Sequence, residues 1–350
     1  MSVPLWVWAV TAVGVLALVV FDFYAHVRTP HEPTFRESAI WSSVYIALAI
    51  VFGIGLTAVW GLDHGGEYFA GYITEKSLSV DNLFVFLIIM TRFAVPRAYQ
   101  QKVLLVGVAI ALVLRTVFIL LGAAAIAQFS WVFYVFGAFL IYTAVKLARE
   151  DHDSEAPAEY HENGLMRLVR RILPTTTEYH GDRLSVKKAG RRVFTPMLVV
   201  MIAIGSTDVL FALDSIPAIF GLTKEPYIVF TTNAFALLGL RQLYFLLGGL
   251  LSRLVYLSEG LAFILGFIGV KLILEAMHTN ELPFINGGEH VEWAPEIPIW
   301  LSLTVILGTL TIATIASLLK TRRDGRTPID GPEGAKAAVE PDREPAEDRD

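Results

Sequence analysis

Two aspartates occupy matching positions in apolar stretches of the chain. Asp81 lies in SVDNLFVF, which begins at Ser79, and Asp208 lies in STDVLFAL, which begins at Ser206. A third aspartate, Asp214, follows six residues after Asp208. Because a carboxylate inside hydrocarbon costs at least a few kcal/mol, each of these side chains needs a positive partner, a bound cation or a proton. Their positions therefore indicate the binding of a positively charged species.

The acids in these apolar stretches outnumber the arginines. Two arginines, Arg115 and Arg241, face four aspartates: Asp22, Asp81, Asp208 and Asp214. A surplus of buried carboxylates suits a divalent cation, and hard oxygen ligands such as the amide of Asn82 favour manganese, magnesium or calcium. The alternative is a set of structural ion pairs. In that case Arg115 and Arg241 neutralise Asp81 and Asp208, or they anchor helix packing.

The spacing of Asp208 and Asp214 restricts joint ligation. On a regular helix, residues six apart point about 120° away from each other. Both carboxylates can bind one ion only if the helix is interrupted between them. Pro217 removes a helical hydrogen bond, so we expect such a break near it.

The polar landmarks recur as a repeat. Asp81 and Asp208 are followed, 34 and 33 residues later, by Arg115 in LRTVFILLG and Arg241 in LRQLYFLLG. Each repeat closes with a lysine and a glutamate four residues apart, in VKLARE and in VKLILE. Chance rarely reproduces four landmarks in one order, so the sequence predicts two related units of three apolar segments each.

Composition defines the elements that carry these residues. The 350 residues are 55% hydrophobic and 17% charged, which is too apolar for an ordinary soluble domain. Apolar runs of about 20 residues, long enough to span about 30 Å of hydrocarbon, predict an all-α polytopic membrane protein with nine transmembrane helices. These runs cover residues 4–24, 39–60, 72–94, 100–127, 129–148, 196–220, 227–250, 255–276 and 298–319.

Basic residues predict the orientation. Most lysines and arginines fall in one set of connections, and the opposite set has few beyond Lys76 and Lys224. The positive-inside rule then places the N-terminus outside and the C-terminus in the cytoplasm. With three spans per repeat and a polar loop between the repeats, the second repeat enters from the opposite side. Such inverted repeats bind substrate near the bilayer midplane.

These features divide the chain into six parts. Two N-terminal helices and their loops occupy residues 1–71, and the first repeat occupies 72–150. A cytoplasmic loop covers 151–195, followed by the second repeat at 196–276. An external loop and the last helix cover 277–323, and an acidic tail at 324–350 has the composition of a disordered segment. The chain contains no cysteine, which excludes disulfides and thiolate chemistry.

Longer strings resemble a known family. EKSLSVDNLFVF from Glu75, FALDSIPAIF from Phe211 and FALLGLRQLYFLL from Phe235 are similar to sequences of the TerC/Alx family of integral membrane proteins. The resemblance implies that six positions belong to the metal site: Asp22, Glu75, Asp81, Asn82, Asp208 and Asp214. Relatives commonly carry a glutamate three residues before the position of Asp208, whereas this chain has Gly205, which implies weaker or altered cation binding.

The resemblance implies a multi-pass protein of the bacterial cell (inner) membrane that exports divalent cations, manganese first among them, with protons as the exchange partner. The alternative is a non-transporting membrane partner in a metal or tellurite stress-resistance complex. An enzyme is not expected, because the GxGD motif of intramembrane aspartyl proteases is absent. We expect no cofactor, with the metal ion as substrate. The expected partners are the bilayer and protein partners or further copies of the chain, and no nucleic acid.

Overall fold

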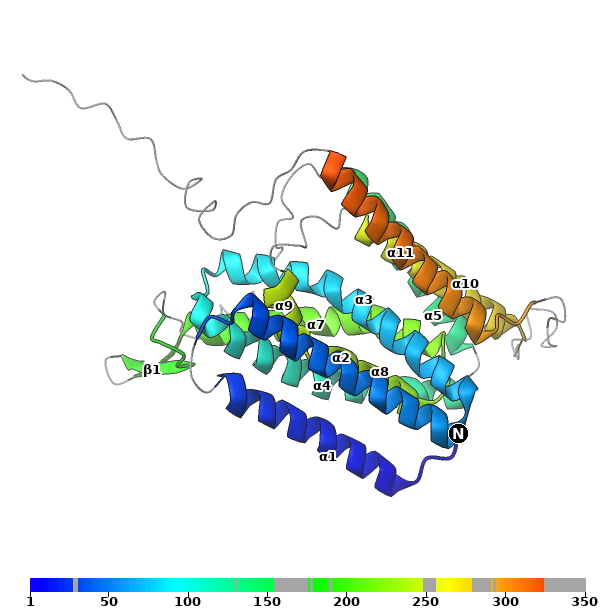
Figure 1. Cartoon of the computed structure of the whole chain (residues 1–350), viewed down its shortest axis with the longest axis horizontal. Coiled ribbons are helices and arrows are strands. Elements are labelled where there is room, and N and C mark those ends of the chain that lie inside the picture. Colours follow the sequence, from blue (N-terminus) through cyan, green and yellow to red (C-terminus); the bar gives the residue numbers. More distant parts are fainter. Residues whose placement is uncertain are drawn as a thin grey trace, which may run out of the picture.

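A computed structural model describes residues 1–27, 31–129, 131–153, 176, 179–188, 191–247, 256–278, 291 and 294–323. Helices make up most of this part of the chain (Figure 1), which confirms the all-α polytopic fold. Their bounds are α1 Leu5–Asp22, followed by the π-helical turn η1 Phe23–Val27, α2 Phe35–Trp60, α3 Leu62–Arg92, α4 Arg97–Gln128, α5 Val132–Asp153, α7 Pro196–Phe220, α8 Pro226–Leu237, α9 Leu240–Leu247, α10 Leu257–His278 and α11 Ile299–Arg323. The predicted tail at 324–350 lies outside the described residues.

Among the described residues, seven helices are long and apolar enough to cross a membrane. They are α2, α4, α7 and α10 over their full lengths, and segments of α1 with η1, α5 and α11. The two predicted spans absent from this set fall on α3, which is rich in charged residues, and on the pair α8 and α9, each of which is short. The count of nine spans and the inverted symmetry stay predictions.

Helix α3 is longer than predicted. It begins at Leu62, ten residues before the expected start at residue 72. Its first turns contain Asp63, His64 and Glu67, whose polarity is typical of a loop, and this hid the start of the helix. Lys76 therefore lies near the middle of α3, and its predicted place beside an external connection was wrong.

The break predicted near Pro217 is also wrong. Helix α7 continues as an α-helix from Pro196 to Phe220 with Pro217 inside it. This proline lies in the last turn, where it removes the amide donor of the Leu213 carbonyl without interrupting the helix. The second repeat is instead interrupted between α8 and α9, where the sequence predicted one helix over residues 227–250.

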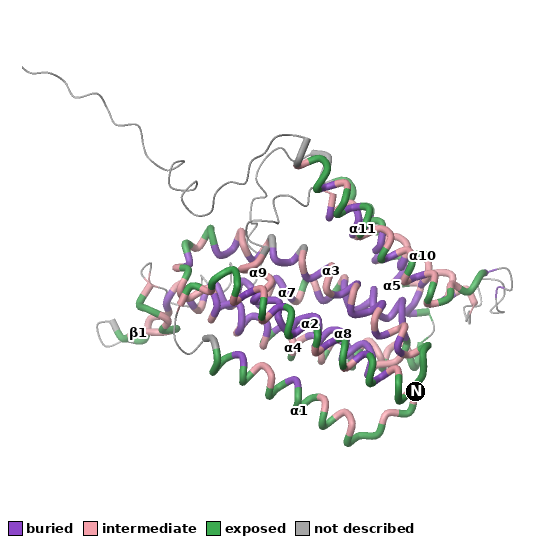
Figure 2. The backbone as a smooth tube through the Cα atoms, viewed as in Figure 1, coloured by how far each residue is buried: buried purple, intermediate pink, exposed green. Residues whose placement is uncertain are grey.

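The helices differ in how deeply they lie in the bundle. In α1 only Val15 and Asp22 are buried, whereas α8 is buried from Tyr227 to Leu237 (Figure 2). Figure 1 shows α1 at one edge of the molecule and α5, α10 and α11 together as an inclined group. Since apolar side chains cover the exposed side of α1, we expect that side to face lipid.

Small residues bring α5 and α10 together. A Cβ atom added to Gly137 would lie 2.8 Å from the carbonyl oxygen of Gly269, and one added to Gly269 would lie 2.9 Å from that of Gly137. Neither position has room for a side chain. This close approach of two backbones is characteristic of helix packing in membranes.

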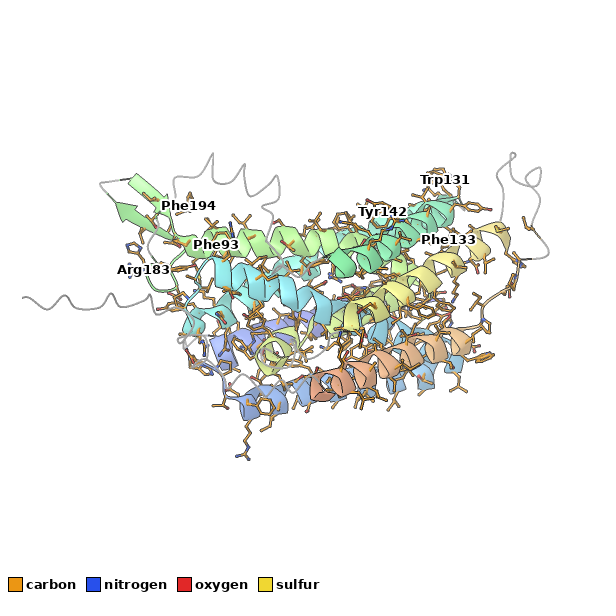
Figure 3. The ribbon with its side chains drawn as sticks, turned by 90° about the horizontal axis from the view of Figure 1, so that it is seen from above. Phe93, Trp131, Phe133, Tyr142, Arg183 and Phe194 are labelled. Atoms are coloured by element: carbon orange, nitrogen blue, oxygen red, sulfur yellow. The ribbon has the colours of Figure 1, made fainter. Side chains whose placement is uncertain are left out.

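The long loop before α7 contains a β-hairpin that the sequence analysis did not predict. Strands β1 (Ser185–Lys188) and β2 (Arg191–Phe194) pair in antiparallel fashion. The hydroxyl of Tyr179 donates a hydrogen bond to the carbonyl of Phe93 at 2.7 Å, which ties the hairpin end of the loop to the end of α3. Figure 3 shows Phe93 and Phe194 at this end of the molecule and Trp131 at the other.

Candidate cation site

A buried arginine organises the centre of the bundle. Arg115 lies on α4, and its side chain is 1% exposed. Its Nε and Nη2 atoms donate to the two carboxylate oxygens of Asp208 on α7 at 3.1 and 3.2 Å. Its Nη1 atom donates to Glu75 on α3, to Ser215 Oγ at 2.9 Å and to Asn233 Oδ1 at 3.0 Å. We call these five residues the Arg115 cluster.

Four helices bring the Arg115 cluster to mid-depth. Asp208 is the central residue of α7, and Glu75 and Arg115 lie within one turn of the midpoints of α3 and α4. At a rise of about 1.5 Å per residue, these charges lie as far from water as the helices allow. Asn233 contributes from α8, whose residues Tyr227–Leu237 are all buried.

Local hydrogen bonds orient the oxygen atoms toward the arginine. The amide nitrogen of Asn233 donates to the carbonyl of Val229 at 2.9 Å, one turn earlier, so Oδ1 is the atom that faces Arg115. Ser79 lies one turn after Glu75, and its hydroxyl donates to Glu75 Oε1 at 3.4 Å. The helices therefore hold both side chains in place.

The Arg115 cluster carries more negative than positive charge. With both carboxylates ionised, Glu75 and Asp208 face one guanidinium, which leaves one negative charge unmatched. Glu75 Oε2 is buried and has no hydrogen-bond partner within the described part of the chain. Buried carboxylate oxygens normally accept a hydrogen bond. An oxygen that accepts none, in a cluster with excess negative charge, is suited to binding a cation.

A second buried cluster surrounds Asp22 at the end of α1. Asp22 Oδ1 accepts three hydrogen bonds: from Arg241 Nη2 at 2.8 Å, from Tyr45 Oη at 2.9 Å and from Gln242 Nε2 at 3.0 Å. Arg241 also donates to Gln101 Oε1. Gln101 precedes Arg115 on α4 by 14 residues, or about 21 Å along the axis. Asp22 is therefore remote from the Arg115 cluster.

Asp214 lies apart from Asp208. Its Oδ1 atom accepts a hydrogen bond from Thr143 Oγ1 on α5 at 3.2 Å, whereas Asp208 binds Arg115. The uninterrupted helix α7 directs the two carboxylates to different neighbours. The helix break on which joint ligation of one ion depends is absent from α7, and the assignment of both aspartates to the metal site stays a prediction.

The remaining predicted residues are on α3. Asn82 is buried, but the hydrogen bonds of the Arg115 cluster do not include it. Asp81 belongs to α3, but its side chain lies outside the described part of the chain. Among the side chains that are described, no three carboxylate or histidine groups converge at distances suited to a metal ion. In this arrangement the guanidinium of Arg115 occupies the space between the two carboxylates.

Sequence reasoning linked the two arginines with Asp81 and Asp208. The structure pairs Arg115 with Asp208 and Glu75, and pairs Arg241 with Asp22. The neutral partners Ser215, Tyr45 and Gln242 were missed. Their sequence signal is a single polar residue in an apolar run, which also occurs at many packing positions.

Comparison with known proteins reveals clear relatives. The model of the integral membrane protein TerC family matches residues 60–325. An uncharacterized membrane protein of Mycobacterium tuberculosis is 52% identical over 320 residues, covering 90% of this chain and 80% of that protein. An uncharacterized membrane protein of Myxococcus xanthus is 39% identical, covering 93% of this chain and 96% of its own length.

A third relative has a more specific name. The Escherichia coli protein named "Putative membrane-bound redox modulator Alx" is 37% identical over 317 residues, covering 88% of this chain and 92% of that protein. No solved structure matches the chain. The matched interval contains both carboxylates and the arginine of the Arg115 cluster.

Proposed function

Because this chain belongs to the TerC family of integral membrane proteins, we propose that it exports divalent metal cations, manganese first among them, across the bacterial cell membrane. The observation that carries the proposal is the Arg115 cluster. Two carboxylates, an amide oxygen and a hydroxyl oxygen surround a single guanidinium in the middle of the bundle. All four are hard oxygen ligands of the kind that manganese accepts.

In this proposal Arg115 is the counter-ion of the site when no metal is bound. A divalent cation carries twice the charge of a guanidinium, and it competes for the same oxygens of Glu75 and Asp208. Binding of the cation then requires the guanidinium to release these carboxylates. Release of the metal restores the ion pairs seen in the structure, so the two carboxylates are never left buried without a positive partner.

The exchange partner in this proposal is the proton, as the family resemblance implies. Transport is then driven by the proton gradient and is sensitive to its collapse. The N-terminus outside and the C-terminus in the cytoplasm remain the orientation proposed from the basic residues. Export then corresponds to movement of the metal into inside-out vesicles.

The test measures uptake of radioactive manganese into inside-out vesicles, with and without a proton gradient. Asp208→Asn and Glu75→Gln each keep the shape of the side chain and remove its charge, so we expect both to abolish uptake. Asp182→Asn is the matched control, since Asp182 lies in the loop near the hairpin and binds Lys102. Parental uptake by both cluster variants, or loss of uptake in the control alone, would refute the proposal.

The docked hairpin favours a second candidate function, that of a non-transporting partner in a metal or tellurite stress-resistance complex. The loop that carries it binds the bundle through Tyr179 and Phe93, and through Lys102 and Asp182 at 2.6 Å. Some relatives are named as redox modulators, but this chain has no cysteine, so thiol chemistry would have to come from a partner. If this second function is correct, a substitution at an exposed position of the hairpin, such as Lys187→Glu, should abolish metal tolerance. Vesicles from the wild type should then take up no manganese, as should vesicles from the variant.

A further inference from the structure

The apolar segment that follows α7 is interrupted in the middle of the bundle. Helix α8 ends at Leu237, α9 begins at Leu240, and Gly239 between them has a φ of +79°. A Cβ atom added to Gly239 would lie 3.0 Å from Cβ of Tyr45. Both the backbone conformation and the space therefore restrict this position to glycine.

The interruption releases main-chain carbonyls from helical hydrogen bonding. In a continuous helix, the carbonyls of Ala236 and Leu238 would accept from the amides four residues later. Here both accept hydrogen bonds from the ammonium of Lys76 on α3, at 3.1 and 3.5 Å. The end of α8 also carries the negative pole of a helix dipole, which favours a cation at this place.

The two repeats differ at this point in a correlated way. When Asp81 is aligned with Asp208, Lys76 corresponds to Ala203. When Arg115 is aligned with Arg241, Gly239 corresponds to Val113, and α4 runs through Val113 without interruption. Thus Lys76 in the first repeat faces the break at Gly239 in the second repeat. At the equivalent positions, Ala203 in the second repeat goes with the uninterrupted helix α4 in the first.

The charged side chains of the two buried clusters bind one another. Glu75 and Asp208 bind Arg115, and Asp22 binds Arg241. Among the described side chains, no carboxylate lies within ion-pair distance of the Lys76 ammonium; its hydrogen bonds go to the two carbonyls. The protein therefore holds this ammonium as it would hold a free monovalent cation, with main-chain oxygens at a helix break.

We propose that the carbonyls of Ala236 and Leu238 form a monovalent-cation site and that the Lys76 ammonium is its tethered occupant. Removal of the lysine side chain then opens the site to Na⁺ or K⁺. Water admitted into the vacated space completes the coordination of the ion. This inference concerns the stability of the break and does not depend on the export of divalent cations.

The test compares two substitutions that remove the charge. Lys76→Ala leaves space for an ion, whereas Lys76→Met fills the space with an apolar side chain of similar length. The melting temperature of each purified protein is measured in NaCl, in KCl and in N-methylglucamine chloride at equal ionic strength. We expect Lys76→Ala to be stabilised saturably by Na⁺ or K⁺, and Lys76→Met and the wild type to show no such dependence.

The outcomes that overturn the proposal are specific. A Lys76→Ala protein whose melting temperature ignores both cations has no vacated cation site. A Lys76→Met protein as stable as the wild type shows that the carbonyls need no cation. If Lys76→Ala fails to accumulate in any salt, Lys76→Arg and Lys76→Gln decide the matter. We expect Arg to preserve the fold and Gln to lose it, whereas equal stability of the two shows that a neutral hydrogen-bond donor suffices.

Discussion

Replacement of Arg115 by leucine removes the positive charge of the Arg115 cluster and leaves a side chain of smaller volume. Glu75 and Asp208 are 0% and 3% exposed, so neither carboxylate can reach water without movement of the helices. Ser215 and Asn233 lose a donor at the same time. We expect the Arg115→Leu protein to fold poorly.

The size of the effect follows from the contacts. Arg115 makes five hydrogen bonds, three of them to carboxylates. Charged hydrogen bonds contribute about 1.5–3 kcal/mol each, but relaxation of the freed groups reduces their sum. Removal of one partner of a buried ion pair costs about 3–5 kcal/mol of stability. Because Arg115→Leu leaves two carboxylates without their partner, we expect its loss of stability at the upper end of this range. Arg241→Leu strands Asp22 alone, which keeps Tyr45 and Gln242 as donors, so we expect the lower end.

The measurement is the free energy of unfolding in mixed detergent and SDS micelles, followed by the fluorescence of the 7 tryptophans. Lys102→Leu is the matched control on the same helix, because it breaks a partly exposed ion pair with Asp182. Such surface pairs contribute about 0–1 kcal/mol. The predicted order of destabilisation is therefore Arg115→Leu, then Arg241→Leu, then Lys102→Leu.

A triple variant separates charge from packing. Arg115→Met combined with Glu75→Gln and Asp208→Asn removes the guanidinium and both stranded charges together. We expect it to recover most of the stability lost in Arg115→Leu, since replacement of a whole buried ionic group by neutral side chains is often tolerated. Equal stability of Arg115→Leu and the Lys102→Leu control would show that Arg115 is no counter-charge at all.

Three further predictions concern the cation site, the topology and the hairpin. Gly205→Glu should bind manganese more tightly than the matched Gly205→Ala protein in equilibrium binding, and equal or weaker binding contradicts the role of the missing carboxylate. Cysteines placed at Ser154 and Asn286 should react with an impermeant reagent from opposite sides of the membrane, and labelling from one side contradicts the inverted repeats. The Lys102 ammonium lowers the pKa of Asp182 through a hydrogen bond. The wild type should therefore be more stable than Lys102→Leu above the ordinary aspartate pKa of about 3.9. This difference in stability should vanish as the pH falls through the lower pKa of Asp182 in the folded protein. A difference that persists unchanged at acidic pH assigns the effect of Lys102 to packing.

The limited space around Gly205 affects the prediction for Gly205→Glu. A Cβ atom at this position would lie 3.3 Å from Cγ2 of Ile110 on α4, which is a tight contact. Any side chain at residue 205 therefore requires a small shift of Ile110. The alanine variant carries the same steric cost without the carboxylate, which is why it is the proper reference for manganese binding.

Hydrophobicity was sufficient to predict the helical fold. Apolar runs located α7 over residues 196–220, the same bounds that the structure has. They failed for the start of α3, because Asp63 and Glu67 make its first turns look like a loop. They also failed for the break at Gly239, since glycine is frequent inside continuous transmembrane helices and does not by itself indicate a break.

The candidate site was predicted in part. The need of Asp208 for an arginine followed from the cost of a buried carboxylate, and the structure supplies Arg115. Glu75 was only one of six positions that the family resemblance implied. Its pairing with Arg115 depends on the register between α3 and α4, which periodicity does not specify. Asp214 was grouped with Asp208 because of their closeness in the chain. A straight helix separates them, and only tertiary structure decides which neighbour each one finds.

The two arginines become available to their acids at different times during synthesis. Glu75 and Arg115 are 40 residues apart, on consecutive helices, so they can pair as a helical hairpin soon after α4 leaves the ribosome. Asp22 can pair with Arg241 only after a further 219 residues have been synthesised. At about 5–20 residues per second, the carboxylate of α1 spends about 10–45 s in the membrane region before its arginine exists. Until then α1 remains free to move laterally or to be held by an insertion factor, and its docking through Asp22 is expected to be among the last steps of assembly.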